Sequence, residues 1–377
     1  MTRKNLFLSA VILLVLALIA AFFFWQSNRP KEPVKIGFLA VLSGVYSLEG
    51  VRSREGIILA VEKKNAEGGI NGRPIELIIK DDQNDREVAK VAMKELIDEG
   101  VVAILAHSSS TNTLEVIPIL NESDVLMIGD AGSALISGYD DNYFRIDVST
   151  DQSAKAFAKL SKDIVDADKI GGIIDMANPG YTEVLYNNFK DAFLDLGGEA
   201  DPPVKYNSSE QPVFTDLIND LGDVDVALVV GSEAHMALLT QHIKMKSPDI
   251  DIIVPYFTTD YMELGGIYTD GVYSNSSFDE SLMTEELEMW SRDFNKRFND
   301  ELTHTVIVLI EASQILFQIM EENKSGETLK ETLYRLEPYK GFQGEISFDQ
   351  YGEVERNQYI IQLNDKKEQI IGAIEPK

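Results

Sequence analysis

The stretch VVAILAHSSSTNT, residues 101–113, joins an apolar strand to the start of a helix. Its first six residues are all apolar, which is typical of a strand covered on both faces in a parallel sheet. Four side chains with hydroxyl groups follow in a row, from Ser108 to Thr111. In open α/β sheets, ligands bind beyond the carboxyl ends of the strands, where helix N-termini carry free N–H groups and partial positive charge. The stretch therefore predicts both an α/β fold and an anion-binding corner.

The alternation of strand and helix continues on both sides of this stretch. The first half is predicted to contain strands at 34–41, 74–80, 101–106 and 125–129 and helices at 50–66, 86–100 and 112–121. The pattern then restarts, with strands at 170–175, 224–230 and 250–257 and helices at 151–164, 181–196, 233–246, 282–298 and 304–322. A β-rich tail follows. Such alternation indicates βαβ units, so we expect an α/β protein with two doubly wound, mostly parallel sheets.

The composition is that of a globular protein and limits the classes of function. The chain has 377 residues, of which 44% are hydrophobic and 25% charged, so two domains with ordinary cores are expected. The net charge of −28 indicates a self-repelling, well-solvated surface and speaks against nucleic-acid binding, which rewards clusters of Lys and Arg. The absence of cysteine excludes disulfides, thiolate catalysis, cysteine-bound zinc and a lipid-modified lipoprotein cysteine.

An apolar segment precedes the alternating pattern. Residues 6–25 carry no charge, have about the length of a bilayer core and end at Trp25, an interfacial residue type. A cleaved signal peptide and an uncleaved anchor both fit this pattern. The segment is long for a signal peptide and no A-x-A cleavage site precedes Gln26, so we expect an anchor. It would tether an extracytoplasmic protein to the cytoplasmic membrane.

The next predicted strand ends with chemistry similar to that of the opening stretch. Ala131, Gly132 and Ser133 follow the apolar run at 125–129. Because the carboxyl ends of neighbouring parallel strands meet at one edge of a sheet, Ser110 and Ser133 are expected in one anion-binding corner. The alternative is that these serines only cap helices.

Other motifs give little support to metal binding or catalysis. The acidic run DDQND, residues 81–85, begins like a calcium loop, but Glu87 stands where that loop requires glycine. His235 and His242 are seven residues apart on one predicted helix, too far to share a metal without other ligands. No G-x-S-x-G, H-E-x-x-H or phosphate-binding loop motif is present. We therefore expect no metal, no cofactor and no enzymatic activity.

Several motifs resemble one known family. They are KIGFLAVLSG at 35–44, GGINGRPIEL at 68–77, DDQND and the late GFQGEISFDQYGEV at 341–354. Together they span nearly the whole chain after residue 33. They resemble the periplasmic leucine/isoleucine/valine-binding proteins, which are type I solute-binding proteins of ABC transporters.

The resemblance implies a clamp of two lobes joined by three crossings of the chain. Lobe 1 would comprise 34–148 and about 277–335, lobe 2 about 149–276 and 336–377, and residues 1–33 the anchor and linker. The implied function is extracytoplasmic binding of an amino acid (branched-chain-like) or a related small carboxylate for an ABC importer. The lobes would close on the ligand, and an ABC permease would recognise the closed form. The alternative is a ligand-sensing domain of the same fold that acts through a partner receptor.

The resemblance also implies roles for residues of the cleft. Ser110 matches a serine, and Ser133 a threonine, whose hydroxyls bind the α-carboxylate of an amino-acid ligand. The carbonyl of Ala131 matches one that accepts from the α-ammonium. Glu49 stands where the family often has an aromatic residue over the ligand, and Tyr181 lies near the position of a cleft tyrosine.

Two departures from the family pattern concern the other end of the ligand. Ser232 occupies the place of a second cleft tyrosine. The usual ammonium-binding acid after the strand at 250–254 is missing, so Glu49, Glu233 or Asp260 would have to supply that charge. The carboxylate end of the pocket is therefore better preserved than the ammonium and side-chain end.

Overall fold

The computed structural model describes residues 31–279 and 282–374. The predicted membrane segment, residues 6–25, lies outside this part of the chain. Among the described residues, one helix, α11 (His304–Glu322), is long and apolar enough to cross a membrane, but 67% of its apolar window is buried inside the protein. We therefore interpret α11 as a core helix of the lobe in which it packs.

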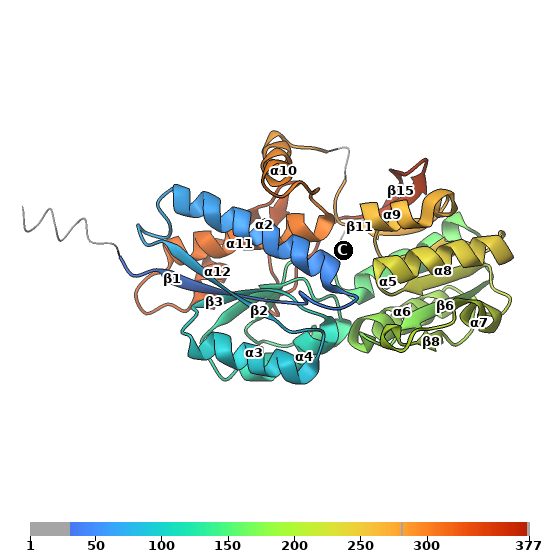
Figure 1. Ribbon diagram of the computed structural model, residues 1–377, viewed down its shortest axis with the longest axis horizontal. Helices are drawn as coiled ribbons and strands as arrows, with labels where there is room; N and C mark the ends of the chain where they lie inside the picture. Colours follow the sequence, from blue (N-terminus) through green and yellow to red (C-terminus); the bar gives the residue numbers. More distant parts are fainter. Residues whose placement is uncertain (1–30, 280–281, 375–377) are drawn as a thin grey trace, which may run out of the picture.

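The first lobe is built on a five-stranded parallel sheet (Figure 1). Its strand order is β2 (Ile75–Asp81), β1 (Val34–Ala40), β3 (Ala103–His107), β4 (Leu126–Gly129) and β5 (Tyr143–Arg145). One face packs against α2 (Ser47–Ala66), α10 (Glu285–Phe298), α11 and α12 (Leu329–Leu336). The other face packs against α3 (Arg86–Asp98) and α4 (Ser110–Leu120). Covering on both faces explains why these strands read as unbroken apolar runs.

The second lobe is built on an eight-stranded mixed sheet. The order is β15 (Lys367–Ile374), β14 (Gln358–Asn364), β11 (Tyr273–Ser276), β10 (Asp251–Ile253), β9 (Val226–Val230), β6 (Lys169–Asp175) and β7 (Glu199–Ala200), with β8 (Val204–Tyr206) also beside β6. The faces are covered by α5 (Thr150–Lys159) and α6 (Pro179–Asp195) on one side and by α7 (Phe214–Asp220), α8 (Glu233–Lys246) and α9 (Thr259–Gly265) on the other.

The chain crosses between the lobes at three places. The first crossing joins β5 to α5, and the second joins β11 to Phe278, which packs in the first core. The third joins Val354, also in the first core, to β14 of the second sheet. This third crossing lies later than the predicted boundary at residue 336. The reason is that residues 339–354, including the hairpin β12 (Tyr339–Lys340) and β13 (Glu345–Ile346), bury apolar side chains against the first lobe.

Some elements differ from the predicted ones for local reasons. Helix α4 begins at Ser110, two residues early, because the hydroxyl of Ser109 accepts a hydrogen bond from the Asn112 N–H at 3.3 Å and caps the helix. Strand β10 ends before Pro255, which has no N–H to donate to a neighbouring strand. The predicted helix at 151–164 is α5 followed by a π-helical turn, Leu160–Ile164.

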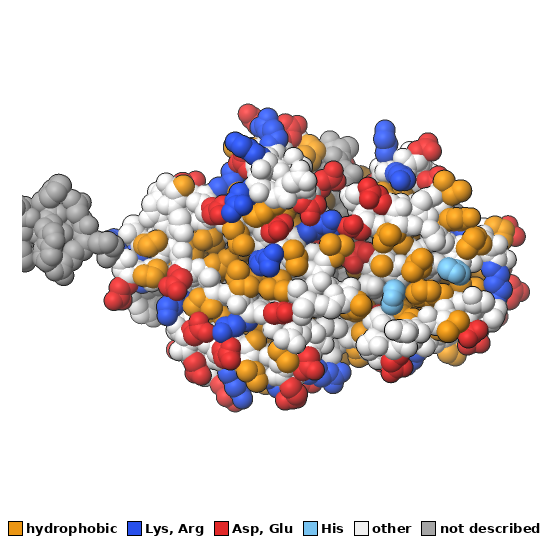
Figure 2. All heavy atoms as spheres, in the orientation of Figure 1, with side chains coloured by type: hydrophobic (Ala, Val, Ile, Leu, Met, Phe, Trp, Pro, Cys, Tyr) orange, Lys and Arg blue, Asp and Glu red, His pale blue; other side chains and the backbone are white. Residues whose placement is uncertain are grey.

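Charged side chains are scattered over the visible face of both lobes, among hydrophobic and uncharged polar surface (Figure 2). Acidic and basic side chains gather along the boundary between the lobes, where α2 approaches α9. One ion pair there, between Arg52 of α2 and Asp260 of α9, measures 2.7 Å and joins the two lobes. Charged side chains at the boundary therefore bind the two lobes to each other directly.

Candidate functional site

A cavity of about 200 Å³ lies between the two lobes, at the carboxyl ends of their strands. The first lobe contributes the ends of β1, β3 and β4 and the start of α2. The second lobe contributes the starts of α6 and α8 and the segment after β10. The residues on which the following description depends are Glu49, His107, Ser110, Ala131, Gly132, Tyr181, Glu233 and Tyr256, which all line the cavity. The position agrees with the rule that ligands bind beyond the strand ends of open α/β sheets.

Ser110 lies at the first turn of α4 and is 2% exposed. Its hydroxyl oxygen accepts a hydrogen bond from the Ser133 N–H at 3.1 Å. Because that contact uses the oxygen as an acceptor, the hydroxyl proton is free to be donated into the cavity. The N-terminus of α4 adds partial positive charge at the same place. The arrangement can bind a carboxylate.

The hydroxyl of Ser133 does not line the cavity. It accepts a hydrogen bond from the Leu135 N–H at 3.2 Å and caps the short 3₁₀ helix Ala134–Ile136. Of the two serines expected in one corner, only Ser110 lines the cavity, and Ser133 donates its main-chain N–H to the Ser110 hydroxyl. The side chain turns away because the 3₁₀ helix begins immediately after it.

Arg145 holds this loop in place and was not singled out from the sequence. Its side chain is fully buried and donates hydrogen bonds to the carbonyls of Gly132, at 3.3 Å, and Ser133, at 2.8 Å. With these carbonyls turned toward the guanidinium, the intervening N–H of Ser133 is directed at Ser110. The only signal in the sequence is a charged residue within the apolar strand β5.

Ala131 and Tyr181 line the cavity from different lobes. The Ala131 N–H donates to the Tyr143 hydroxyl at 2.9 Å, and no other described residue donates to the Ala131 carbonyl. A Cβ atom on the neighbouring Gly132 would lie 3.0 Å from the ring of Tyr181. The small residue therefore lets a tyrosine of the second lobe pack closely on the first.

Two carboxylates from different lobes line the cavity. Glu49, at the start of α2, is 7% exposed and accepts hydrogen bonds from the Arg52 guanidinium at 2.9 Å and the Thr303 hydroxyl at 2.6 Å. Glu233, the first residue of α8, is 6% exposed, and no other described residue donates a hydrogen bond to its side chain or forms an ion pair with it. Burial, followed by the negative charge of Glu49, raises the pKa of Glu233 to about 7.

Two other predicted site residues do not line the cavity. Ser232 is the N-cap residue of α8 and is buried, without a side-chain capping hydrogen bond. Asp260 lies in α9, where it forms the ion pair with Arg52. The structure therefore brings together Ser110, Ala131, Tyr181, Glu49 and Glu233 around the cavity, whereas Ser133, Ser232 and Asp260 are not among its lining residues.

His107 supplies a positive charge beside the corner formed by Ser110. Its Nδ1 atom lies 2.7 Å from a carboxylate oxygen of Asp130. Burial disfavours the charged imidazole, but the Asp130 carboxylate outweighs it together with weaker negative neighbours, and the pKa of His107 rises to about 9. His107 is therefore protonated at neutral pH.

The two lobes contact each other directly at the edge of the cavity. The hydroxyl of Thr111 donates to the Asn178 side-chain oxygen at 3.0 Å and accepts from the Gly180 N–H at 2.9 Å. The Tyr46 hydroxyl donates to Asp175 at 2.7 Å. Because each contact joins a residue of one lobe to a residue of the other, the structure is a closed arrangement of the clamp.

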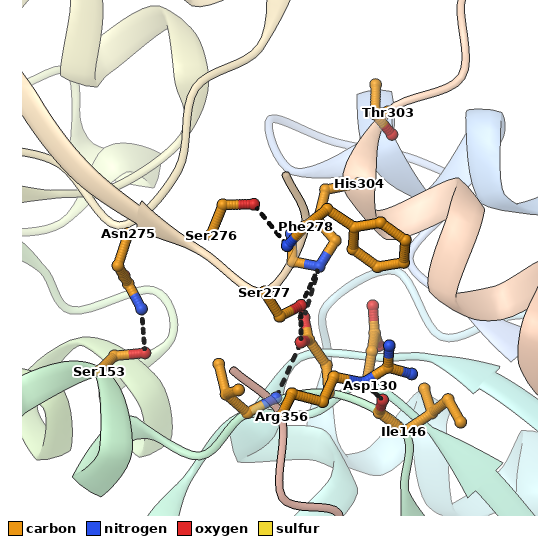
Figure 3. A network of polar contacts seen from close by, with 12 residues as sticks. Asp130, Ile146, Ser153, Asn275, Ser276, Ser277, Phe278, Thr303, His304 and Arg356 are labelled. Atoms are coloured by element: carbon orange, nitrogen blue, oxygen red, sulfur yellow. Dashed lines mark hydrogen bonds and ion pairs between the residues drawn. The ribbon is translucent and has the colours of Figure 1, made fainter. Parts of the chain in front are cut away.

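The crossings between the lobes are linked by polar contacts (Figure 3). The Ser277 hydroxyl lies 2.7 Å from Nε2 of His304 and donates to Asp147 at 3.1 Å. Arg356, in the third crossing, donates from Nε to the Ile146 carbonyl at 3.0 Å. Ser277 belongs to the second crossing, and Ile146 and Asp147 belong to the first. The first crossing is therefore joined to both of the others, and Asp147 and Ser277 also line the cavity.

Comparison with known proteins identifies the family. A family model described as periplasmic binding protein matches residues 33–368. The leucine-, isoleucine-, valine-, threonine-, and alanine-binding protein of Pseudomonas aeruginosa is 28% identical over 111 residues, which cover 29% of this chain and 30% of that protein. The chain thus matches less than a third of the length of this curated relative.

Two solved structures have a similar fold. The branched-chain amino acid transporter substrate binding protein LivJ from Streptococcus pneumoniae, in complex with isoleucine, has a TM-score of 0.81 at 19% identity and covers 92% of this chain and 100% of its own. A solute binding protein of an ABC transporter from R. palustris, in complex with benzoate, has a TM-score of 0.78 at 18% identity and covers 92% and 98%. With a family model that matches most of its length and a two-lobed fold that agrees, the chain belongs to the periplasmic binding protein family.

Proposed function

We propose that this protein is an extracytoplasmic solute-binding protein of an ABC-type importer that binds an amino acid, or a related small carboxylate, between its lobes. The observation that carries this proposal is the cavity between the lobes with the Ser110 hydroxyl free to donate into it. The two solutes named for the similar structures, isoleucine and benzoate, both carry a carboxylate. The carboxylate is therefore the part of the ligand that the site supports best.

The mechanism that we propose is closure of the lobes around the solute. The carboxylate binds Ser110 and the N-terminus of α4 in the first lobe, and a ligand ammonium donates to the Ala131 carbonyl. Tyr181, Tyr256 and Glu233 of the second lobe complete the site only when the lobes meet. A solute that contacts both lobes shifts the population from open to closed.

The closed form would then deliver its solute to an ABC permease. In this proposal residues 6–25 tether the protein to the cytoplasmic membrane, on the extracytoplasmic side. None of the comparisons supports the alternative in which the protein acts as a sensor through a partner receptor. Binding and release, without turnover, are the expected chemistry.

Thermal unfolding of the full chain against a panel of solutes tests this proposal. The panel contains aliphatic, basic and acidic amino acids, benzoate and simple amines without a carboxylate. A solute that binds only the folded protein raises the melting temperature according to the ratio of its concentration to its Kd. We expect a concentration-dependent rise with at least one carboxylate-bearing solute. A rise only with the amines that lack a carboxylate would contradict the proposal.

A further inference from the structure

Glu233 is a buried carboxylate in the wall of the cavity, and in the closed protein its own main-chain N–H is the one donor that the described residues offer it. It is 6% exposed, and no other described residue donates a hydrogen bond to it. Burying an ionised carboxylate without a compensating contact is costly. A group that enters the cavity and donates to Glu233 would remove that cost.

The nearest charges do not neutralise this end of the cavity. Arg52 is shared among three carboxylates, those of Glu49 at 2.9 Å, Asp260 at 2.7 Å and Asp300 at 3.0 Å. Arg52 itself does not line the cavity, and the two histidines that do are each beside a carboxylate, with His107 2.7 Å from Asp130 and His304 3.5 Å from Asp147. The surplus of carboxylates over cations therefore remains when the lobes are closed.

We propose that the solute carries a positively charged side chain, which lies between Glu49 of the first lobe and Glu233 of the second, so that the ligand is a basic amino acid or a comparable carboxylate-bearing amine. This inference rests on the proposed function and specifies the class of solute. Closure brings both carboxylates to one cavity, and like charges in a poorly solvated site repel each other. A cation between them turns that repulsion into attraction toward both lobes.

An aliphatic side chain cannot donate a hydrogen bond to Glu233. With the ligand's α-ammonium at the Ala131 carbonyl, as proposed above, no other group would neutralise Glu233, and the two carboxylates would continue to oppose closure. Tyr256 and Phe257, which line the same cavity, offer apolar surface for the methylene groups of a long basic side chain, whose charged end would extend beyond them. The combination of aromatic walls and opposed carboxylates therefore favours a basic side chain over a short or purely apolar one.

Calorimetric titration of the full chain with lysine, ornithine, arginine and norleucine tests the inference. Norleucine has the carbon chain of lysine without the terminal ammonium, so the comparison isolates the charge. We expect the best basic amino acid to bind at least tenfold more tightly than norleucine. Equal binding, or tighter binding of norleucine, would overturn the inference while leaving the proposed function intact.

Two variants locate the effect. Glu233→Gln keeps the shape of the side chain and is expected to weaken the basic amino acid at least tenfold without weakening norleucine; Glu49→Gln should act in the same direction. Glu263→Gln, on the exposed surface of α9, changes net charge equally and should change neither affinity. If Glu233→Gln and Glu263→Gln behave alike, Glu233 does not bind the cation. If wild-type protein binds none of these amino acids and no carboxylate of the wider panel, the proposed function itself fails.

Discussion

At the scale of single residues, the direction of one hydrogen bond gives the cavity its chemistry. The Ser110 hydroxyl oxygen accepts a hydrogen bond from the Ser133 N–H. Its proton can therefore be donated to a ligand in the cavity that Ser110 lines. Ser133 has the same side chain, but its hydroxyl oxygen accepts a hydrogen bond from the Leu135 N–H and caps the next helix. Two serines that look equivalent in the sequence therefore have different roles.

Substitution of each serine separates binding from capping. Ser110→Ala removes a donor to a carboxylate, a type of hydrogen bond worth about 1.5–3 kcal/mol, so we expect affinity for the carboxylate-bearing solute to fall about tenfold or more. Ser133→Ala is the matched control and should lower the melting temperature slightly, since a lost cap costs about 1 kcal/mol, while affinity stays within a few-fold. Titration calorimetry and thermal unfolding measure the two effects. Equal loss of affinity in both variants would contradict the assignment.

The sequence located this corner but not the orientation of its side chains. Ser110 and Ala131 follow predicted strands, and the rule for strand ends places both near a ligand without a structure. Whether a side chain turns toward the cavity depends on where the next helix starts. The predicted start of α4 was two residues late, and the 3₁₀ helix after Ser133 was not predicted. Arg145 could not be recognised because the contacts by which it orients the loop are to the main-chain carbonyls of Gly132 and Ser133.

The pKa of Glu233 gives a dependence of affinity on pH. The groups that face Glu233 are Glu49 and Arg52 of α2, His107 of β3 and Tyr256, and His107 stays protonated up to about pH 9. Because Glu233 holds a proton below about pH 7 in the absence of a cation, a basic solute must displace that proton. Affinity for a basic amino acid should therefore rise from pH 5.5 to about 7.5 and then level off, by about tenfold per pH unit at most.

Calorimetric titrations from pH 5.5 to 7.5 test whether the affinity for the basic amino acid rises with pH. Glu233→Gln should remove the rise, because the side chain no longer titrates. An affinity for the basic amino acid that falls as pH rises through 7 would show that the protonated form of Glu233 is the one that binds.

At the scale of elements, two helix N-termini form the contact that holds the lobes together beside the cavity. Helix α4 begins in the first lobe and α6 in the second, and Thr111 lies between them. Its hydroxyl satisfies the free Gly180 N–H of α6, while the Asn178 oxygen also accepts from the Thr111 N–H of α4 at 3.2 Å. Each N-terminus thus gains a capping contact from the other only when the clamp is closed.

Removal of the Thr111 hydroxyl should weaken closure without disturbing either lobe. Thr111→Val removes two hydrogen bonds worth about 0.5–1.5 kcal/mol each, so we expect solute affinity to fall several-fold while the melting temperature without solute stays nearly the same. Thr111→Ser keeps the hydroxyl and is the control. In a double-mutant cycle with Asn178→Ala, an interaction energy near zero would contradict the proposed contact between the helices.

Long, regular elements could be predicted from the sequence and short ones could not. Strands β1 to β4 of the first lobe and helices such as α3, α8 and α11 have apolar patterns that could be recognised and were placed within a few residues. Strand β5, with three residues, and helices α7, α9 and α12, with seven or eight, are too short to show a period. Their conformation depends on the neighbours against which they pack.

At the scale of the whole molecule, the return of the chain to the first lobe could not be predicted from local pattern. Residues 339–354 read as part of a β-rich tail, and only their burial against the first core assigns them to that lobe. The tail then divides, and β14 and β15 complete the second sheet. This division places Arg356 at the third crossing, where it binds the first crossing through the Ile146 carbonyl.

The central claim is that a small solute binds between the lobes and closes them, and a distance between the lobes tests it most directly. The chain has no cysteine, so Lys94→Cys on α3 and Asp191→Cys on α6, both exposed, give a unique pair for fluorescence labels. These helices lie on the side of the molecule where α4 meets α6. Single-molecule energy transfer should move to a shorter-distance population when a stabilising amino acid is added, and Ser110→Ala should require a higher concentration for the same shift. A solute that raises the melting temperature but leaves the distance distribution unchanged would contradict the account.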